Sequence, residues 1–261
     1  MTLVRVQERA SAVVLAFPHS GTYVPPEVAG DLNNIGEHLS DTDWHLPQLY
    51  AGLLPGATTV CAEFHRYVID ANRDPTGKSL YPGQATTDLI PATDFDGQPI
   101  WHRAPDAAQR MQRIVKYHKA YHRALRQALN HARDRHGYAI LYDCHSIRSR
   151  IPRLFDGILP DFNIGTFDGQ SCDLRLAAEV EAVCRNAGGF STVVDGRFKG
   201  GWTTRHYGRP ADGIHVIQME LAQSTHLETE TAPWTYSTAK TNRLRDILEK
   251  VLCSLDRWRP N

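Results

Sequence analysis

The sequence predicts an α/β fold in which a mostly parallel sheet is covered by helices on both faces. Short apolar runs alternate along the 261 residues with longer segments that carry apolar positions at helical spacing. Several short runs are apolar on both faces, as expected of strands buried between two helical layers. No linker-like stretch, internal repeat or low-complexity tract interrupts this pattern. We therefore predict a single domain over residues 1–261.

The elements follow one another in a regular order. Apolar runs predict strands at 11–17, 58–64, 67–72, 138–145, 190–196 and 214–221. Helix-period segments predict helices at 41–54, 106–137, 171–189 and 236–258. Gly137 and the pair Gly188–Gly189 stand where helix C-caps are expected, because glycine readily adopts the left-handed conformation.

Composition and charge exclude several classes of protein. Lys plus Arg and Asp plus Glu each number 29, and this balance lacks the basic surplus of a general nucleic-acid binder. No apolar run approaches the roughly 18 residues that a membrane span needs, and residues 1–17 lack the pattern of a signal peptide. The five cysteines show no CxxC spacing and predict neither a disulfide framework nor a thiolate zinc site. We expect a soluble, cytoplasmic protein without nucleic-acid or membrane partners; the sequence makes no prediction of oligomeric state.

Chemistry-bearing side chains follow four of the predicted strands. In a parallel sheet, functional groups collect just beyond the C-terminal strand ends, so side chains from different strands meet at one edge. The first strand leads to His19, and the other three lead to Asp70, Asn72, Arg73, Asp143, His145 and Glu220. Polar residues at four strand ends predict one site at that edge of the sheet.

His19 and His145 are candidate metal ligands. A single histidine at a strand end is more often structural, but two at equivalent ends favour a shared role. Two imidazoles and one carboxylate form the three-ligand set of catalytic zinc, which leaves one position open for water. The carboxylate could come from Asp41 or Asp43, and Asp43 could equally serve as an acid at the start of a helix.

Basic and acidic residues near these histidines indicate an anionic small-molecule substrate. Arg148, Arg150 and Arg153 follow His145 within eight residues and could be solvated or could pair with a substrate carboxylate. Glu220 ends a strongly apolar strand, where poor solvation raises a carboxyl pKa toward the range of a general base. It could alternatively be an acid paired with a basic neighbour.

Other catalytic motifs are weak or absent in the sequence. His118 and His122 have the i, i+4 spacing of HExxH zinc sites, but Lys119 stands where that motif has its glutamate, which favours a structural role. No GxSxG motif occurs, and Cys144 alternates with its neighbours on the strand, which predicts a core position. Neither GxxxxGK[ST] nor GxGxxG is present, so a nucleotide cofactor is not indicated.

Taken together, five segments closely resemble the N-formylglutamate amidohydrolase family over about residues 12–250. The segments are "FPHSGTYVPPEV", "DTDWHLPQLY", "RYVIDANRDPTGKSLYPGQ", "YDCHSIRSRIPRLFDGILPDFNIGTFDGQSC" and "FKGGWTTRHYGRPADGIHVIQMELAQ". The resemblance implies a three-layer α/β/α fold of the phosphorylase/hydrolase-like, zinc-carboxypeptidase-like type. It also implies hydrolysis of N-formyl-L-glutamate to formate and L-glutamate, the last step of a histidine-degradation route.

The resemblance also implies roles for individual residues. Metal ligands for one zinc ion per chain would be His19, Asp43 and His145, and Glu220 would be the general base and acid. Zinc carboxypeptidases take two ligands from one HxxE segment, whereas Thr22 stands at the glutamate position here. Substrate carboxylates would be held by Asn72, Arg73, Arg148, Arg150, Arg153 and Arg205.

Two other functions stay open on the sequence. One is a deacylase for another N-acyl acidic amino acid, or a small carboxypeptidase, and the size of the pocket beside the metal would distinguish these enzymes. The other is a metal-free protein that binds glutamate-like ligands, for which metal content is the discriminating observation.

Overall fold

A seven-stranded mixed sheet lies at the centre of the computed structural model, which describes residues 2–79 and 86–260. Its strand order is β1-β3-β2-β4-β7-β5-β6. The pairs β2–β3, β2–β4, β4–β7 and β5–β6 are parallel, whereas β1–β3 and β5–β7 are antiparallel. The strands are β1 (Val4–Gln7), β2 (Val13–Phe17), β3 (Thr58–Ala62), β4 (Ala139–Ile147), β5 (Phe162–Gly165), β6 (Thr192–Val194) and β7 (Ile214–Ala222).

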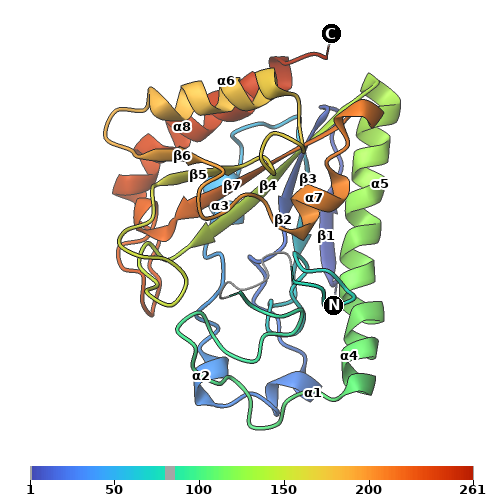
Figure 1. Ribbon diagram of the computed structural model, residues 1–261, viewed down its shortest axis with the longest axis vertical. Coiled ribbons are helices and arrows are strands. Elements are labelled where there is room, and N and C mark those ends of the chain that lie inside the picture. Colours follow the sequence, from blue (N-terminus) through green and yellow to red (C-terminus); the bar gives the residue numbers. More distant parts are fainter. Residues whose placement is uncertain (1, 80–85, 261) are drawn as a thin grey trace.

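Helices cover both faces of this sheet, which confirms the three-layer fold (Figure 1). One apolar core joins the sheet to α3, α6 and α8, and Figure 1 shows α6 and α8 side by side. The second core joins the opposite face to α5 and α7. The helices are α1 (Pro26–Ala29), α2 (Asn34–Glu37), α3 (Leu46–Tyr50), α4 (Ala107–Arg113), α5 (Lys119–His136), α6 (Leu174–Arg185), α7 (Trp202–Tyr207) and α8 (Thr238–Arg257).

Side-chain alternation along β4 separates the core from the candidate site. Tyr142 and Cys144 point into the core beneath α3, α6 and α8, which confirms the core position predicted for Cys144. Leu141 points to the α5 face, and the next two residues on that face are Asp143 and His145. The apolar core on the α5 face thus ends at a polar pocket near the C-terminal end of the strand.

The helix predicted at 106–137 forms with one irregularity. It begins at an Asp106 capping box and ends at Gly137, whose φ of 81° confirms the predicted left-handed C-cap. Between α4 and α5, residues Ile114–His118 form a π-helical turn that the sequence pattern did not indicate. The cap predicted at Gly188–Gly189 is wrong, because α6 ends earlier, with Asn186 as its C-cap in a right-handed conformation.

The strand predicted at 67–72 is wrong. Val68 N donates to His65 O at 2.9 Å, and Asp70 accepts the backbone N–H of Asn72 through its carboxylate at 2.8 Å. Such local bonds form turns instead of a ladder, although the segment is buried and apolar. The helix predicted at 41–54 is reduced to α3, and the sequence analysis missed β1, β5, α1, α2 and α7.

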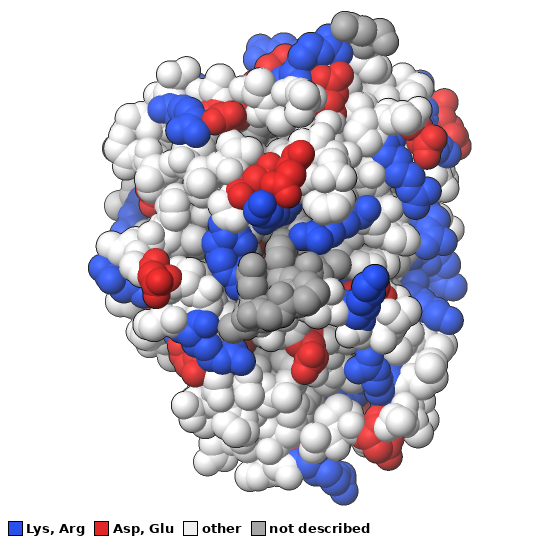
Figure 2. Space-filling view, viewed as in Figure 1, with Lys and Arg blue, Asp and Glu red and all other residues white. Residues whose placement is uncertain are grey.

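Lys and Arg side chains gather along the edge of the molecule where α4 and α5 lie (Figures 1 and 2). The exposed residues there include Lys116, Lys119, Arg123 and Arg126. These four basic residues of the long helix face solvent, whereas Arg113 is buried. Within residues 2–79 and 86–260, no helix is both long enough and apolar enough to cross a membrane.

Candidate active site

A cavity of about 650 Å³, including its mouth, opens at the C-terminal ends of the central strands. His19 reaches it from beyond β2, His145 from β4, and Gln218 and Glu220 from β7. The sequence predicted this meeting of strand ends. A cavity of this size suits a small-molecule ligand.

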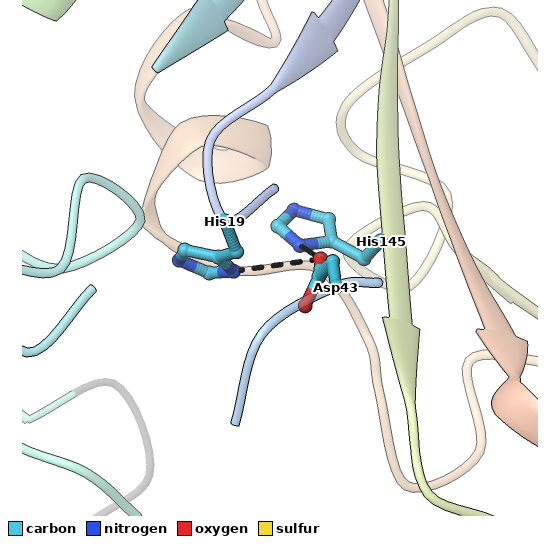
Figure 3. Close-up of side chains that lie close together, drawn as sticks. All are labelled: His19, Asp43 and His145. Carbon is cyan, nitrogen blue, oxygen red and sulfur yellow. Dashed lines mark ion pairs between the residues drawn. The ribbon is translucent and has the colours of Figure 1, made fainter. Parts of the chain in front are cut away.

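His19, Asp43 and His145 point toward one another at the cavity (Figure 3). Asp43 Oδ2 lies 3.8 Å from His19 Nδ1 and 3.3 Å from His145 Nδ1. All three residues are buried, and their potential ligand atoms lie within 4.8 Å of one another. The structure therefore brings together the three residues predicted as metal ligands.

The loop before α3 places Asp43, and not Asp41, in the group with the two histidines. The backbone N–H of Asp43 donates to His19 O at 3.0 Å, and its Oδ2 accepts from Ser146 N at 3.2 Å. Asp41 instead accepts from Phe95 N at 3.0 Å, away from the two histidines. Asp43 does not cap α3, because that role falls to His45.

Each candidate histidine ligand faces a second carboxylate with its other ring nitrogen. His19 Nε2 lies 2.6 Å from Asp70 Oδ1, and His145 Nε2 lies 3.0 Å from Asp143 Oδ2. The second contact is not aligned as a hydrogen bond, and neither oxygen of Asp143 has a hydrogen-bond partner among the described residues. Carboxylates in these positions orient metal-binding imidazoles and leave Nδ1 for the metal.

The buried charges shift the pKa values of these groups in opposite directions. Burial lowers the pKa of His19, and the charge of Arg66 adds to this. Burial also opposes protonation of His145, but Asp143 and Asp43 outweigh it and raise its pKa well above the usual value. The same negative surroundings that favour a proton on His145 would favour a bound cation.

Glu220 lies beside His145 because β4 and β7 pair in register. Asp143 is opposite Gln218, and His145 is opposite Glu220. Burial raises the pKa of Glu220 to about 8. Its Oε2 accepts a long hydrogen bond of 3.4 Å from Gln218 Nε2. This is the carboxyl group with raised pKa that the sequence predicted at the strand end.

Asn72 and Arg73 line the same cavity from the turn that replaces the predicted strand. The Asn72 side chain lies 3.1 Å from His145 Nε2 and accepts from Thr203 N at 2.9 Å. The Arg73 guanidinium donates to Thr87 O at 2.9 Å and to Thr87 Oγ1 at 2.8 Å. The C-terminal part of the motif at 66–84 lies outside the described residues.

The structure does not bring the other four predicted arginines to the cavity lining. Arg148 pairs with Asp96 at 2.9 Å, and the Arg205 guanidinium lies over the Phe167 ring, 4.6 Å from its centre. Arg150 and Arg153 are exposed and likewise absent from the described lining. For Arg148, Arg150 and Arg153 the reason is the path of the chain after β4, which carries them away from the strand end, whereas Arg205 lies on α7.

Arg197 lines the cavity, and the sequence analysis missed it. The residue directly follows the strand predicted at 190–196, which contains β6. The rule that identified the other strand-end residues was therefore also a signal for Arg197.

His118 and His122 are buried on the inner side of the long helix, outside the candidate metal centre. His118 Nε2 lies 3.0 Å from Arg73 O, and His122 Nε2 lies 2.7 Å from Ala71 O. This agrees with the structural role favoured by the sequence. The two rings contact the backbone on either side of Asn72.

Comparison with known proteins identifies the family of this chain. The model of the N-formylglutamate amidohydrolase family matches residues 11–227. The chain belongs to this family. It is 47% identical over 249 residues to N-formylglutamate deformylase of Pseudomonas putida, covering 94% of this chain and 92% of that protein. The corresponding enzyme of Pseudomonas aeruginosa is 46% identical, covering 94% of this chain and 93% of the relative.

Solved structures show the same fold for this family member. An N-formylglutamate amidohydrolase from Ralstonia eutropha superposes with a TM-score of 0.81 at 26% identity, covering 98% of both chains. A protein from Agrobacterium tumefaciens superposes with a TM-score of 0.74 at 17% identity, covering 98% of this chain and 97% of the other. At that identity the second likeness concerns the fold alone.

Proposed function

We propose that this protein hydrolyses N-formyl-L-glutamate to formate and L-glutamate in a zinc-dependent reaction. The observation that carries the proposal is the buried group of His19, Asp43 and His145, whose two histidines line one cavity together with Glu220. Relatives named N-formylglutamate deformylase, at 46% and 47% identity, support the substrate. The guanidiniums in the cavity wall support a ligand that carries carboxylates.

The donor set of the candidate metal centre fits zinc. Two imidazole nitrogens and one carboxylate match the three protein ligands of catalytic zinc sites, with one position left open. Asp70 and Asp143 face the outer nitrogens of His19 and His145, as expected around a metal. When bound, the ion supplies Lewis-acid polarisation of the formyl carbonyl.

In this proposal Glu220 moves the protons of the reaction. It takes a proton from the attacking water as the water oxygen bonds to the formyl carbon. It then gives that proton to the glutamate nitrogen as the carbon–nitrogen bond breaks, so that formate and an amine leave. The raised pKa of Glu220 makes it a stronger base than an exposed carboxylate.

Asn72 and Arg73 position the substrate in this proposal. Their turn is fixed by the Asp70 carboxylate, and Arg73 adds two bonds to Thr87. A guanidinium anchored in this way offers a charged, oriented donor to a carboxylate near His145.

We include residues 1–261 in one amidohydrolase domain. The five free cysteines support the cytoplasm as the location of the protein.

The test is formate release by the purified protein from N-formyl-L-glutamate, with N-acetyl-L-glutamate and a peptide ending in glutamate as competing substrates. We expect the formyl compound to react fastest, because the relatives share this activity by name. Faster release of acetate would indicate a different deacylase, and release of the terminal residue from the peptide would indicate a carboxypeptidase. Binding without turnover of any compound would indicate a ligand-binding protein.

A further inference from the structure

Arg197 contributes to the cavity wall, but the mechanism above assigns it no role. It lies between β6 and α7, and its Nε donates to Leu154 O at 2.8 Å. Its guanidinium also lies over the Phe198 ring, 5.4 Å from the ring centre. These contacts hold the guanidinium in a defined position at the wall.

The other two guanidiniums of the cavity have different surroundings. Arg66 is buried, donates to Asp70 at 2.7 Å and lies over the Phe95 ring. Arg73 follows Asn72, which contacts His145, so Arg73 belongs to the part of the wall next to the candidate metal centre. This position suits the α-carboxylate of an N-acyl amino acid, which is one carbon away from the reacting nitrogen.

Arg197 instead belongs to an apolar part of the wall. Leu154 and Phe198, which contact Arg197, both line the cavity, as does Ile147. Methylene groups are favourably buried against such side chains, whereas a carboxylate at the end of the chain needs a charged donor. An apolar strip with a guanidinium beside it matches a short aliphatic side chain that ends in a carboxylate.

We propose that Arg197 binds the side-chain carboxylate of an N-formyl dicarboxylic amino acid and thereby determines substrate selectivity. The inference rests on the proposed function, since it names the group that reads the glutamate side chain. Arg197 is here a specificity residue that contacts the substrate away from the reacting bond. Proton transfer by Glu220 does not depend on it.

The test compares Arg197→Gln with the wild type on N-formyl-L-glutamate and on N-formyl-L-glutamine, which has the same shape without the charge. We expect kcat/KM for the glutamate compound to fall about 10- to 1000-fold. For the glutamine compound we expect a change of less than about threefold. Arg197→Lys should recover part of the loss, because it restores the charge without the planar donor pair.

Arg243→Gln is the matched control. Arg243 on α8 likewise lies over a phenylalanine ring, that of Phe190, and donates to a backbone carbonyl, Gly188 O, but it is absent from the cavity lining. We expect wild-type rates on both compounds for this variant. An equal loss on both compounds in Arg197→Gln, or no loss on either, would overturn the proposal.

Binding of the product separates this proposal from the proposed function. Calorimetry measures L-glutamate and L-glutamine binding to the wild type and to Arg197→Gln without any turnover. We expect the wild type to prefer L-glutamate and the variant to lose about 10-fold or more of that preference. An unchanged preference would refute the role of Arg197, whereas failure of formate release alone would refute the reaction.

Discussion

Both histidines of the candidate metal centre lie between two carboxylates. His19 lies between Asp43 and Asp70, and His145 lies between Asp43 and Asp143. For His19, the hydrogen bond to Asp70 favours a proton on Nε2, so Nδ1 keeps its lone pair on the side of Asp43. The rings are therefore oriented for a cation by residues that need not touch it.

At the scale of single residues, Glu220→Gln tests the proposed role of Glu220 in proton transfer. The amide keeps the size of the side chain but cannot accept a proton from water. We expect kcat to fall at least about 100-fold, the usual contribution of a positioned general base. Zinc content, measured by atomic absorption, should stay at the wild-type level because Glu220 lies outside the ligand set. Near-normal turnover would remove Glu220 from the mechanism.

At the scale of elements, the π-helical turn Ile114–His118 lies between α4 and α5, and its last residue contacts the turn that carries Asn72 and Arg73. The turn inserts a residue into the helical ladder, and such insertions are frequent at functional sites. His118 at its end and His122 one turn later both reach backbone carbonyls, those of Arg73 and Ala71. We infer that this contact fixes the position of Asn72 between them.

His122→Leu tests this positioning role. The variant loses the bond to Ala71 O, and we expect kcat/KM to fall about 10- to 100-fold, as for a small misplacement of catalytic groups. In His122→Gln the amide nitrogen can replace Nε2 as donor, so most of the activity should return. Zinc content and far-UV circular dichroism should match the wild type in both variants. If His122→Leu and His122→Gln lose activity equally, the hydrogen bond to Ala71 O is not the cause of the loss.

His226 lies between β7 and α8, and its burial makes the free energy of unfolding of the protein depend on pH. The ring is buried, and burial lowers its pKa to about 4. A histidine in the unfolded chain titrates near pH 6.5, so acid protonates the unfolded chain first. The free energy of unfolding therefore falls as the pH drops from about 6.5 toward about 4.

His226→Gln should remove this contribution. Between pH 7.5 and 5, we expect the free energy of unfolding of the wild type to fall by roughly 2 kcal/mol more than that of the variant. Urea denaturation of both proteins at the two pH values measures the difference. Parallel pH profiles would show that His226 is not the source.

Much of this arrangement could be predicted from local patterns. The alternation that buries Leu141 also places Asp143 and His145 on one face, and the pattern is visible in the sequence. Asp41 and Asp43 could not be separated, because the choice depends on hydrogen bonds with distant segments, such as that from Phe95 N to Asp41. The turn at 67–72 was missed for a related reason, since a side-chain bond replaces strand pairing there.

The whole chain has a formal net charge of zero, but acidic side chains outnumber basic ones in the buried candidate site. Asp43, Asp70 and Asp143 are each at most 1% exposed, and among the described cavity residues the buried guanidinium near them is that of Arg66. Burying carboxylates without compensation is costly, so a bound dication would offset the excess negative charge. A bound metal ion would therefore balance charge in this site as well as serve the proposed reaction.

A zinc titration of metal-free protein, with formate release from N-formyl-L-glutamate as the readout, tests whether the candidate metal centre is required for the reaction. The protein is stripped with a chelator, and zinc is added back in fractions of the chain concentration. We predict that the stripped protein is inactive and that activity rises linearly to a break at about one zinc per chain, as one three-ligand site requires. Full formate release by the stripped protein would contradict the account.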